Sequence, residues 1–172
     1  MELKIFLTRE LALVVKERSK PCVSYFVPPP RRRLFSTPPL KVYRGPSEWS
    51  PHIATLTKRC QWPLCWDITL EESHATIVVR QQRLWGSLKL FTCEGKKYAW
   101  RDDVDLIDLQ NGHIIADIRQ TGSTDYGLVL TIYREGQEMM DMVVITAISM
   151  SRQQQLVRII GYQIGGVGAL AL

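Results

Sequence analysis

The stretch MMDMVVITAISM, residues 139–150, is the most apolar run of the chain and carries one charged residue, Asp141. A helix that crosses a bilayer needs about 20 apolar residues. This run covers 139–150 and then meets the polar sequence SRQQQ. We therefore expect no transmembrane span. The run must instead be covered by the rest of the protein, because water disfavours so much apolar surface.

The charges around this run favour a buried helix over about 138–152. Glu138 and Asp141 lie near its start, and Arg152 and Arg158 follow its end, as the helix dipole prefers. A helix that is apolar on nearly all sides belongs in a core. A strand over MVVITAI is the alternative, since Val, Ile and Thr favour sheets, but the run is longer than a usual strand. The residues expected to form the core of the helix are Met139, Met142, Val143, Val144, Ile145, Ala147 and Ile148.

The distribution of proline divides the chain. All nine prolines lie between Pro21 and Pro63, and a sheet interior excludes proline because it lacks a backbone donor. We therefore predict that residues 1–50 are a basic, Pro-rich and largely disordered arm with a short amphipathic helix at 2–18. A single folded domain over 51–155 and an apolar, Gly-rich tail over 156–172 complete the expected organisation.

Short alternating segments fill the region before the apolar run. Seven segments are rich in β-branched or aromatic residues and are separated by polar turns, including the hairpin signal Asn111-Gly112. Such a series predicts an antiparallel sandwich or barrel. The fold class expected is therefore α+β and mainly β, with a barrel or curved sheet wrapped around the C-terminal helix. The seven segments are 64–70, 74–81, 85–92, 96–101, 104–110, 113–119 and 126–133.

These motifs, in this order, resemble one known group of proteins. The stretches WPLCWDITL, ATIVVR, GKKYAWR, HIIADIR, GLVLTIY and MVVITAI are similar to a fungal domain-of-unknown-function family. That family is related to the tubby C-terminal, LURP-one-related and phospholipid scramblase superfamily. The resemblance covers about residues 52–155 and implies a tubby-like barrel around a hydrophobic C-terminal helix. Such barrels have about twelve strands, so either further strands lie in 41–63 or the barrel is reduced.

The charge of the chain is uneven, and it suggests a partner. Residues 1–63 carry 12 Lys/Arg and 4 Asp/Glu, whereas residues 64–172 carry 10 and 13. The resemblance implies binding of anionic phospholipid headgroups, and basic residues could supply this site on an anionic membrane surface. A protein-protein interaction module without lipid binding is the alternative. The candidate lipid-binding residues are Arg80, Arg83, Lys96, Lys97 and Arg101, together with the basic arm Arg31, Arg32 and Arg33.

Other chemistry has little support in the sequence. The spacing of Cys60 and Cys65 exceeds that of zinc knuckles, and the aspartates of 102–108 alternate with apolar residues as on a solvated strand. No motif places Cys93 or Ser87 beside His113 as a nucleophile. We therefore expect a non-enzymatic protein without metal, cofactor or sequence-specific nucleic-acid binding. Free cysteines and the lack of a secretory signal point to the cytoplasm, with peripheral membrane association.

Overall fold

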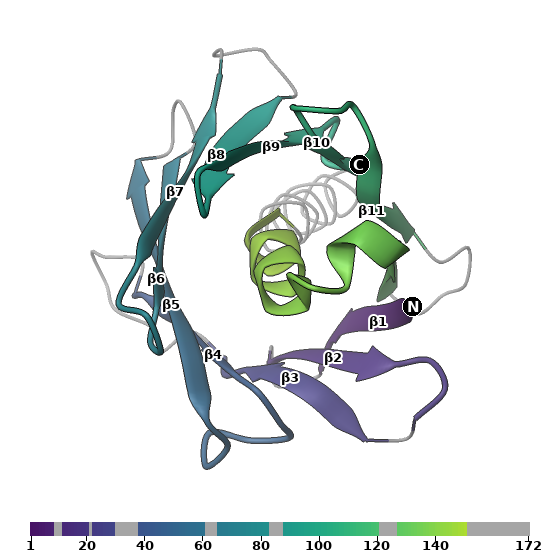
Figure 1. Cartoon of the computed structure of the whole chain (residues 1–172). Coiled ribbons are helices and arrows are strands. Elements are labelled where there is room, and N and C mark those ends of the chain that lie inside the picture. The colour runs from purple at the N-terminus through teal and green to yellow at the C-terminus, as the bar shows by residue number, and fades with distance from the viewer. Residues whose placement is uncertain are drawn as a thin grey trace, which may run out of the picture.

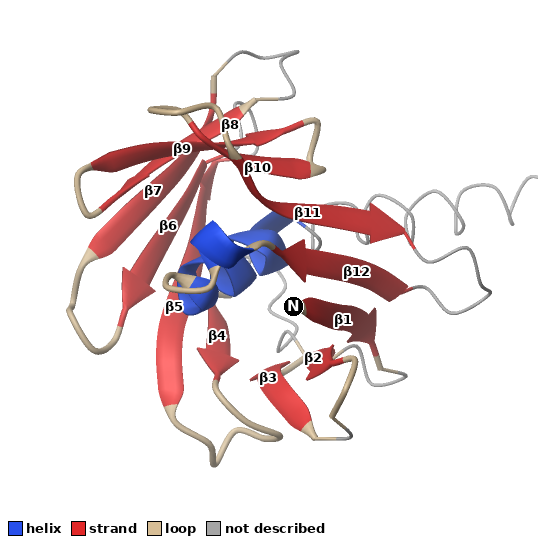
Figure 2. Cartoon of the chain, turned by 45° about the vertical axis from the view of Figure 1, so that its right-hand side comes forward, coloured by secondary structure: helices blue, strands red, loops and turns tan. Residues whose placement is uncertain are grey.

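The computed structural model describes residues 1–8, 12–20, 22–29, 38–60, 65–82, 88–120 and 127–150. Within these residues, twelve antiparallel strands form a closed barrel around one helix, residues 140–150 (Figures 1 and 2). Each strand pairs with its neighbours in sequence, and β1 pairs with β12 to close the ring. The strands are β1 (Glu2–Leu7), β2 (Leu13–Glu17), β3 (Val23–Val27), β4 (Leu40–Tyr43), β5 (His52–Cys60), β6 (Cys65–Leu70), β7 (Thr76–Gln81), β8 (Lys89–Cys93), β9 (Lys96–Arg101), β10 (Asp105–Asp108), β11 (Ile114–Gln120) and β12 (Gly127–Ile132).

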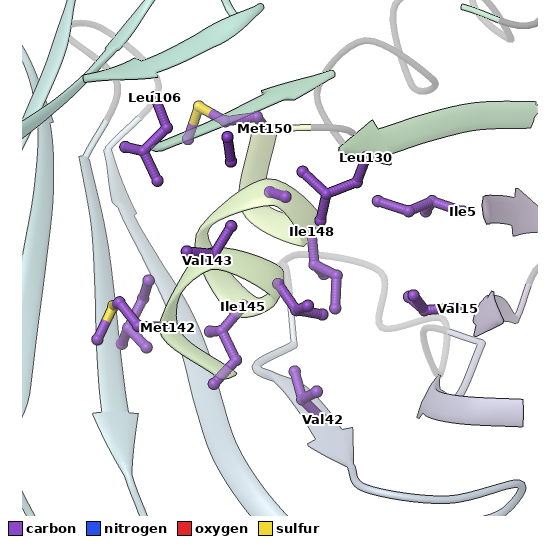
Figure 3. Packing of buried hydrophobic residues seen from close by; sticks show 14 of the residues in the cluster. Ile5, Val15, Val42, Leu106, Leu130, Met142, Val143, Ile145, Ile148 and Met150 are labelled. Carbon is purple, nitrogen blue, oxygen red and sulfur yellow. The ribbon is translucent and has the colours of Figure 1, made fainter. Parts of the chain in front are cut away.

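The central helix is the core of the barrel. Residues 142–150 are all buried, including the hydroxyls of Thr146 and Ser149, which donate to backbone carbonyls three residues earlier. Figure 3 shows Val143, Ile145 and Ile148 among side chains that come from the strands. The helix predicted over 138–152 is confirmed from residue 140 to 150, whereas residues 138–139 form a turn and 151–152 lie outside the described residues. No helix in the described part of the chain has the length and apolar character needed to cross a bilayer.

Buried and more exposed residues alternate along a strand, as a barrel with an apolar interior requires. In β12, Leu128, Leu130 and Ile132 are buried while the residues between them are partly exposed. The tight β8–β9 hairpin has positive φ at both Glu94 and Gly95, which a two-residue turn of this kind needs to match the strand twist. The predicted Asn111-Gly112 turn connects β10 to β11, with Gly112 at φ 75°. The mainly β prediction with one C-terminal helix is thus confirmed.

The prediction for residues 1–50 is wrong. The segment 2–18 is not a helix, and the arm is not largely disordered, because it contributes β1 to β4. The side chains of Leu3 and Ile5 are 1% and 0% exposed, and β1 lies between β12 and β2. The described prolines stand outside the strands, where no ladder donor is lost. The barrel therefore starts at the first strand, and β4 and β5 supply the further strands in 41–63.

One seam of the barrel has minimal strand pairing. β3 and β4 share a single pair in register, Phe26 with Tyr43. The carboxylate of Asp141, in the first turn of the helix, accepts a hydrogen bond from the Tyr25 hydroxyl of β3 at 2.7 Å and forms an ion pair with Arg44, which follows β4. Burial raises the pKa of Tyr25, so its hydroxyl remains a donor at neutral pH. The one charge of the apolar run thus bridges the two strands of this seam.

Val144 tests whether the helix is central. Val144 is 0% exposed, whereas Val104, in the turn after β9, is 39% exposed. We expect Val144→Asp to abolish cooperative unfolding, because burying an unpaired charge costs several kcal/mol against a total stability of about 5–15 kcal/mol. Val104→Asp is the matched control and should keep a sharp transition in urea denaturation. A cooperative transition in Val144→Asp would show that the helix is not the core.

Asp141 tests the β3–β4 seam. We expect Asp141→Ala to lower the free energy of unfolding by about 1–3 kcal/mol, because the buried Tyr25 hydroxyl loses its acceptor. Hydrogen exchange should also become faster at the backbone amides of β3 and β4. Glu138→Ala removes an exposed carboxylate before the helix and serves as the control in denaturant titrations. Equal losses in the two variants would contradict a bridging role for Asp141.

Candidate functional site

The connections between strands alternate between the two ends of the barrel. The turns at 18–20, 44–51, 71–75, 94–95 and 109–113 lie at the end where the helix begins, which we call the mouth. The turn at 102–104 and residue 150 of the helix lie at the other end, which we call the far end (Figures 2 and 3). This alternation follows from an antiparallel meander, in which successive strands run in opposite directions.

The mouth contains an open pocket of about 1430 Å³. Its floor is apolar and combines the first turns of the helix with inward side chains of the strands. Its rim is polar and predominantly acidic. The floor residues are Ile53, Leu70, Cys93, Tyr98, Ile115, Met139, Met140, Met142 and Ile145, and the charged rim residues are Arg44, Glu71, Glu72, Glu94, Lys96, Asp108, Arg134, Glu135, Glu138 and Asp141.

Several polar groups of the pocket are already engaged. Glu71 accepts a hydrogen bond from Thr55 at 3.1 Å and lies 3.5 Å from a ring nitrogen of His52. The carboxylate of Asp108 caps the following turn by accepting from the backbone amide of Gln110 at 2.8 Å. Asp141 is held by Tyr25 and Arg44, as described above. These contacts fix the wall of the pocket, whereas the other glutamates that line it, Glu72, Glu94, Glu135 and Glu138, are exposed.

The titratable groups of the floor are held in their neutral forms. Burial raises the pKa of the Cys93 thiol, and Glu94 raises it further. Burial also raises the pKa of Tyr98, with a second contribution from Asp108. A thiol that stays protonated at neutral pH is a poor nucleophile. The pocket therefore offers apolar contact and negative charge to a ligand, while its thiol and phenol can act as hydrogen-bond donors.

The predicted basic residues do not form a single cluster. Alternation along β9 turns Lys96 into the mouth pocket and Lys97 and Arg101 outward. Lys97 and Arg101 are four residues apart on one strand, or about 13 Å, so they belong to opposite ends. Arg80 is exposed near the far end of β7, and Arg101 pairs with Asp105 at 2.7 Å. Arg83 and the basic arm, Arg31 to Arg33, lie outside the described residues.

The other sequence candidates are distributed over both ends. His52 and His74 lie at the mouth, whereas Cys60 and Cys65 are paired in the backbone register of β5 and β6 near the far end. The aspartates of 102–108 are likewise divided, since Asp108 lies at the mouth. Among the residues that the structure describes, no group of three or more His, Cys, Asp or Glu side chains could hold a metal ion. Ser87 lies outside those residues.

Sequence reasoning did not identify Lys89 as an inward residue of β8. Its register partner is Trp100, which is fully buried, and Lys89 itself is 3% exposed. The ammonium forms an ion pair with Asp103 in the turn after β9. Sequence reasoning also missed the mouth pocket. One available signal was Trp49 in PSEWSP, an aromatic residue in a polar turn, which is 97% exposed.

No family model, no curated protein and no solved structure matches this chain.

The pair of Lys89 and Asp103 gives a test with an internal control. Asp103→Asn should lower the free energy of unfolding by about 2 kcal/mol or more, because it leaves a buried ammonium unpaired. Asp102→Asn is the matched control, since Asp102 is exposed and shares the positive φ of its neighbour. Adding Lys89→Met to Asp103→Asn should recover much of the loss in urea denaturation. Equal stability of the two single Asn variants would contradict the buried pair.

Proposed function

We propose that this chain is a non-enzymatic binding protein of the tubby-like plan that binds anionic phospholipid headgroups with the far end of its barrel. The observation that carries the proposal is the separation of charge between the two ends. The resemblance noted in the sequence points to the same class of ligand. In this proposal the protein is cytoplasmic and peripheral to the membrane.

The mouth and its rim are acidic in the described residues. Ten carboxylates lie there against eight Lys and Arg side chains. The carboxylates are Glu2, Glu17, Glu48, Glu71, Glu72, Glu94, Asp108, Glu135, Glu138 and Asp141, and the cations are Lys4, Lys16, Arg18, Lys20, Arg44, Lys96, Lys97 and Arg134. An anionic membrane would be repelled by this end.

The far end has the opposite balance. Seven cations lie toward it against four carboxylates: Lys41, Lys58, Arg59, Arg80, Lys89, Arg101 and Arg119, with Asp67, Asp102, Asp103 and Asp105, while Asp117 lies midway along β11. The basic arm, Arg31 to Arg33, lies outside the described residues, but the described residues that flank it, Pro29 and Pro38, follow β3 and precede β4 at this end.

Arg80 is the described residue best placed to meet a phosphate. It is exposed on β7, and no ion pair engages it among the residues that the structure describes. A guanidinium can donate two parallel hydrogen bonds to a phosphate. Each Lys or Arg near an anionic surface contributes about 1 kcal/mol. Arg80 and the basic arm together would therefore give a binding energy that depends strongly on salt.

Vesicle co-sedimentation tests this proposal. The full chain should bind phosphatidylcholine vesicles that contain about 20% phosphatidylserine, and raising the salt to about 0.5 M should release it, because the attraction is screened. Arg80→Glu, combined with reversal of Arg31, Arg32 and Arg33, should weaken binding at least tenfold. Lys97→Glu is the control, since the same type of reversal at the mouth should leave binding unchanged.

Three outcomes would contradict the proposal. Equal binding to pure phosphatidylcholine vesicles would show that charge does not drive binding. An equal loss of vesicle binding in the Lys97 and Arg80 variants would show that the far end is not the binding surface. No binding to any vesicle would favour the alternative, a protein-protein interaction module without lipid binding.

A further inference from the structure

The mouth pocket combines an apolar floor with an acidic rim, and the lipid proposal uses neither. The floor includes three methionines of the helix region, Met139, Met140 and Met142. Methionine is flexible and polarizable, so a surface rich in it can adapt to different apolar side chains. A pocket of about 1430 Å³ also exceeds the roughly 300–1,000 Å³ typical of sites for small molecules. The pocket is large enough to take several side chains.

The charge of the rim determines whether the pocket attracts a cationic or an anionic ligand. Glu72, Glu94, Glu135 and Glu138 line the pocket, and no ion pair engages them within the described residues. The N-terminal end of the helix alone would attract an anion. Here, however, the carboxylates of Glu138 and Asp141 lie at that end, and the rim carboxylates outnumber the rim cations. The pocket is therefore complementary to a cationic ligand.

Exposed apolar residues gather at the same end. Among the described residues, six large apolar side chains are exposed, and five of them lie toward the mouth. They are Met1, Trp49, Leu109, Ile114 and Tyr133. Trp49 is 97% exposed in the turn that also contributes Arg44 and Pro51 to the pocket wall. Tryptophan is enriched in the anchors of protein interfaces, and its ring attracts Lys and Arg side chains.

We propose that the mouth binds a basic, apolar segment of a partner protein. Apolar side chains of the segment fill the methionine-rich floor, and its Lys or Arg side chains meet the rim carboxylates and the ring of Trp49. Each described strand pairs on both sides, so the barrel offers no free edge for the segment to extend as an added strand. Recognition therefore depends on side chains in the pocket.

Fluorescence anisotropy with the full chain tests this site. The probe is a fluorescein-labelled peptide in which lysines alternate with leucines. Two control peptides replace the lysines by glutamates or the leucines by serines, and both should bind at least tenfold more weakly than the probe. Glu72→Lys combined with Glu135→Lys should weaken binding of the probe at least tenfold. Asp102→Lys combined with Asp105→Lys, at the far end, is the control with the same change in charge, and it should have no effect.

Trp49→Ser gives an independent variant, because a side chain so exposed is not needed for folding. It should weaken binding of the probe at least threefold while the urea transition stays unchanged. Tight binding of the glutamate peptide or the serine peptide would overturn the proposal. So would equal losses in the two pairs of charge variants. A concentration-dependent dimer that Trp49→Ser abolishes would assign the mouth to a second copy of this chain, and would also overturn it.

Discussion

The burial of the helix by a closed ring of strands is the constraint on which the structure depends. Nine consecutive residues, 142–150, are buried, and only an enclosing sheet can cover a helix on every side. An open sheet would leave one face of the helix in water, at about 25 cal/mol for each Å² of apolar surface. The pairing of β1 with β12 completes the ring. The first strand of the chain is therefore as necessary to the core as the helix itself.

The same constraint explains the charge within the apolar run. A ring of strands is as stable as its least paired seam, and β3 and β4 share one register pair. Asp141 joins Tyr25 on one side of that seam to Arg44 on the other. The seam lies at the start of the helix, where Asp141 remains partly exposed. A carboxylate is tolerated there because its partners satisfy it, whereas a deeper position would leave it without water or a partner.

The sequence was sufficient to predict the helix and the seven strands before it, because strong local patterns specify them. It was insufficient for β1, because Leu3, Phe6 and Leu7 fit a helical period as well as Leu3 and Ile5 fit an alternating one. The choice is made by the pairing with β12, whose first residue lies 125 positions after the first residue of β1, and no local pattern shows that pairing. The inward position of Lys89 escaped prediction for a related reason. A shift of one residue exchanges the two faces of a strand, and periodicity cannot show that Asp103 neutralises the inward lysine.

The distribution of charge over the surface depends on the topology of the barrel more than on position in the sequence. The two segments 1–63 and 64–172 differ in net charge, but that division does not survive folding, because both segments contribute to both ends. In a meander, every second connection lies at the same end of the barrel. The charges of the first, third and fifth connections therefore add up at one end, and those of the second, fourth and sixth at the other. A strand of six residues spans about 20 Å, whereas charges in physiological salt are screened over about 8 Å. The acidic mouth and the basic far end therefore act as independent surfaces, and each can attract a ligand of opposite charge without hindering the other.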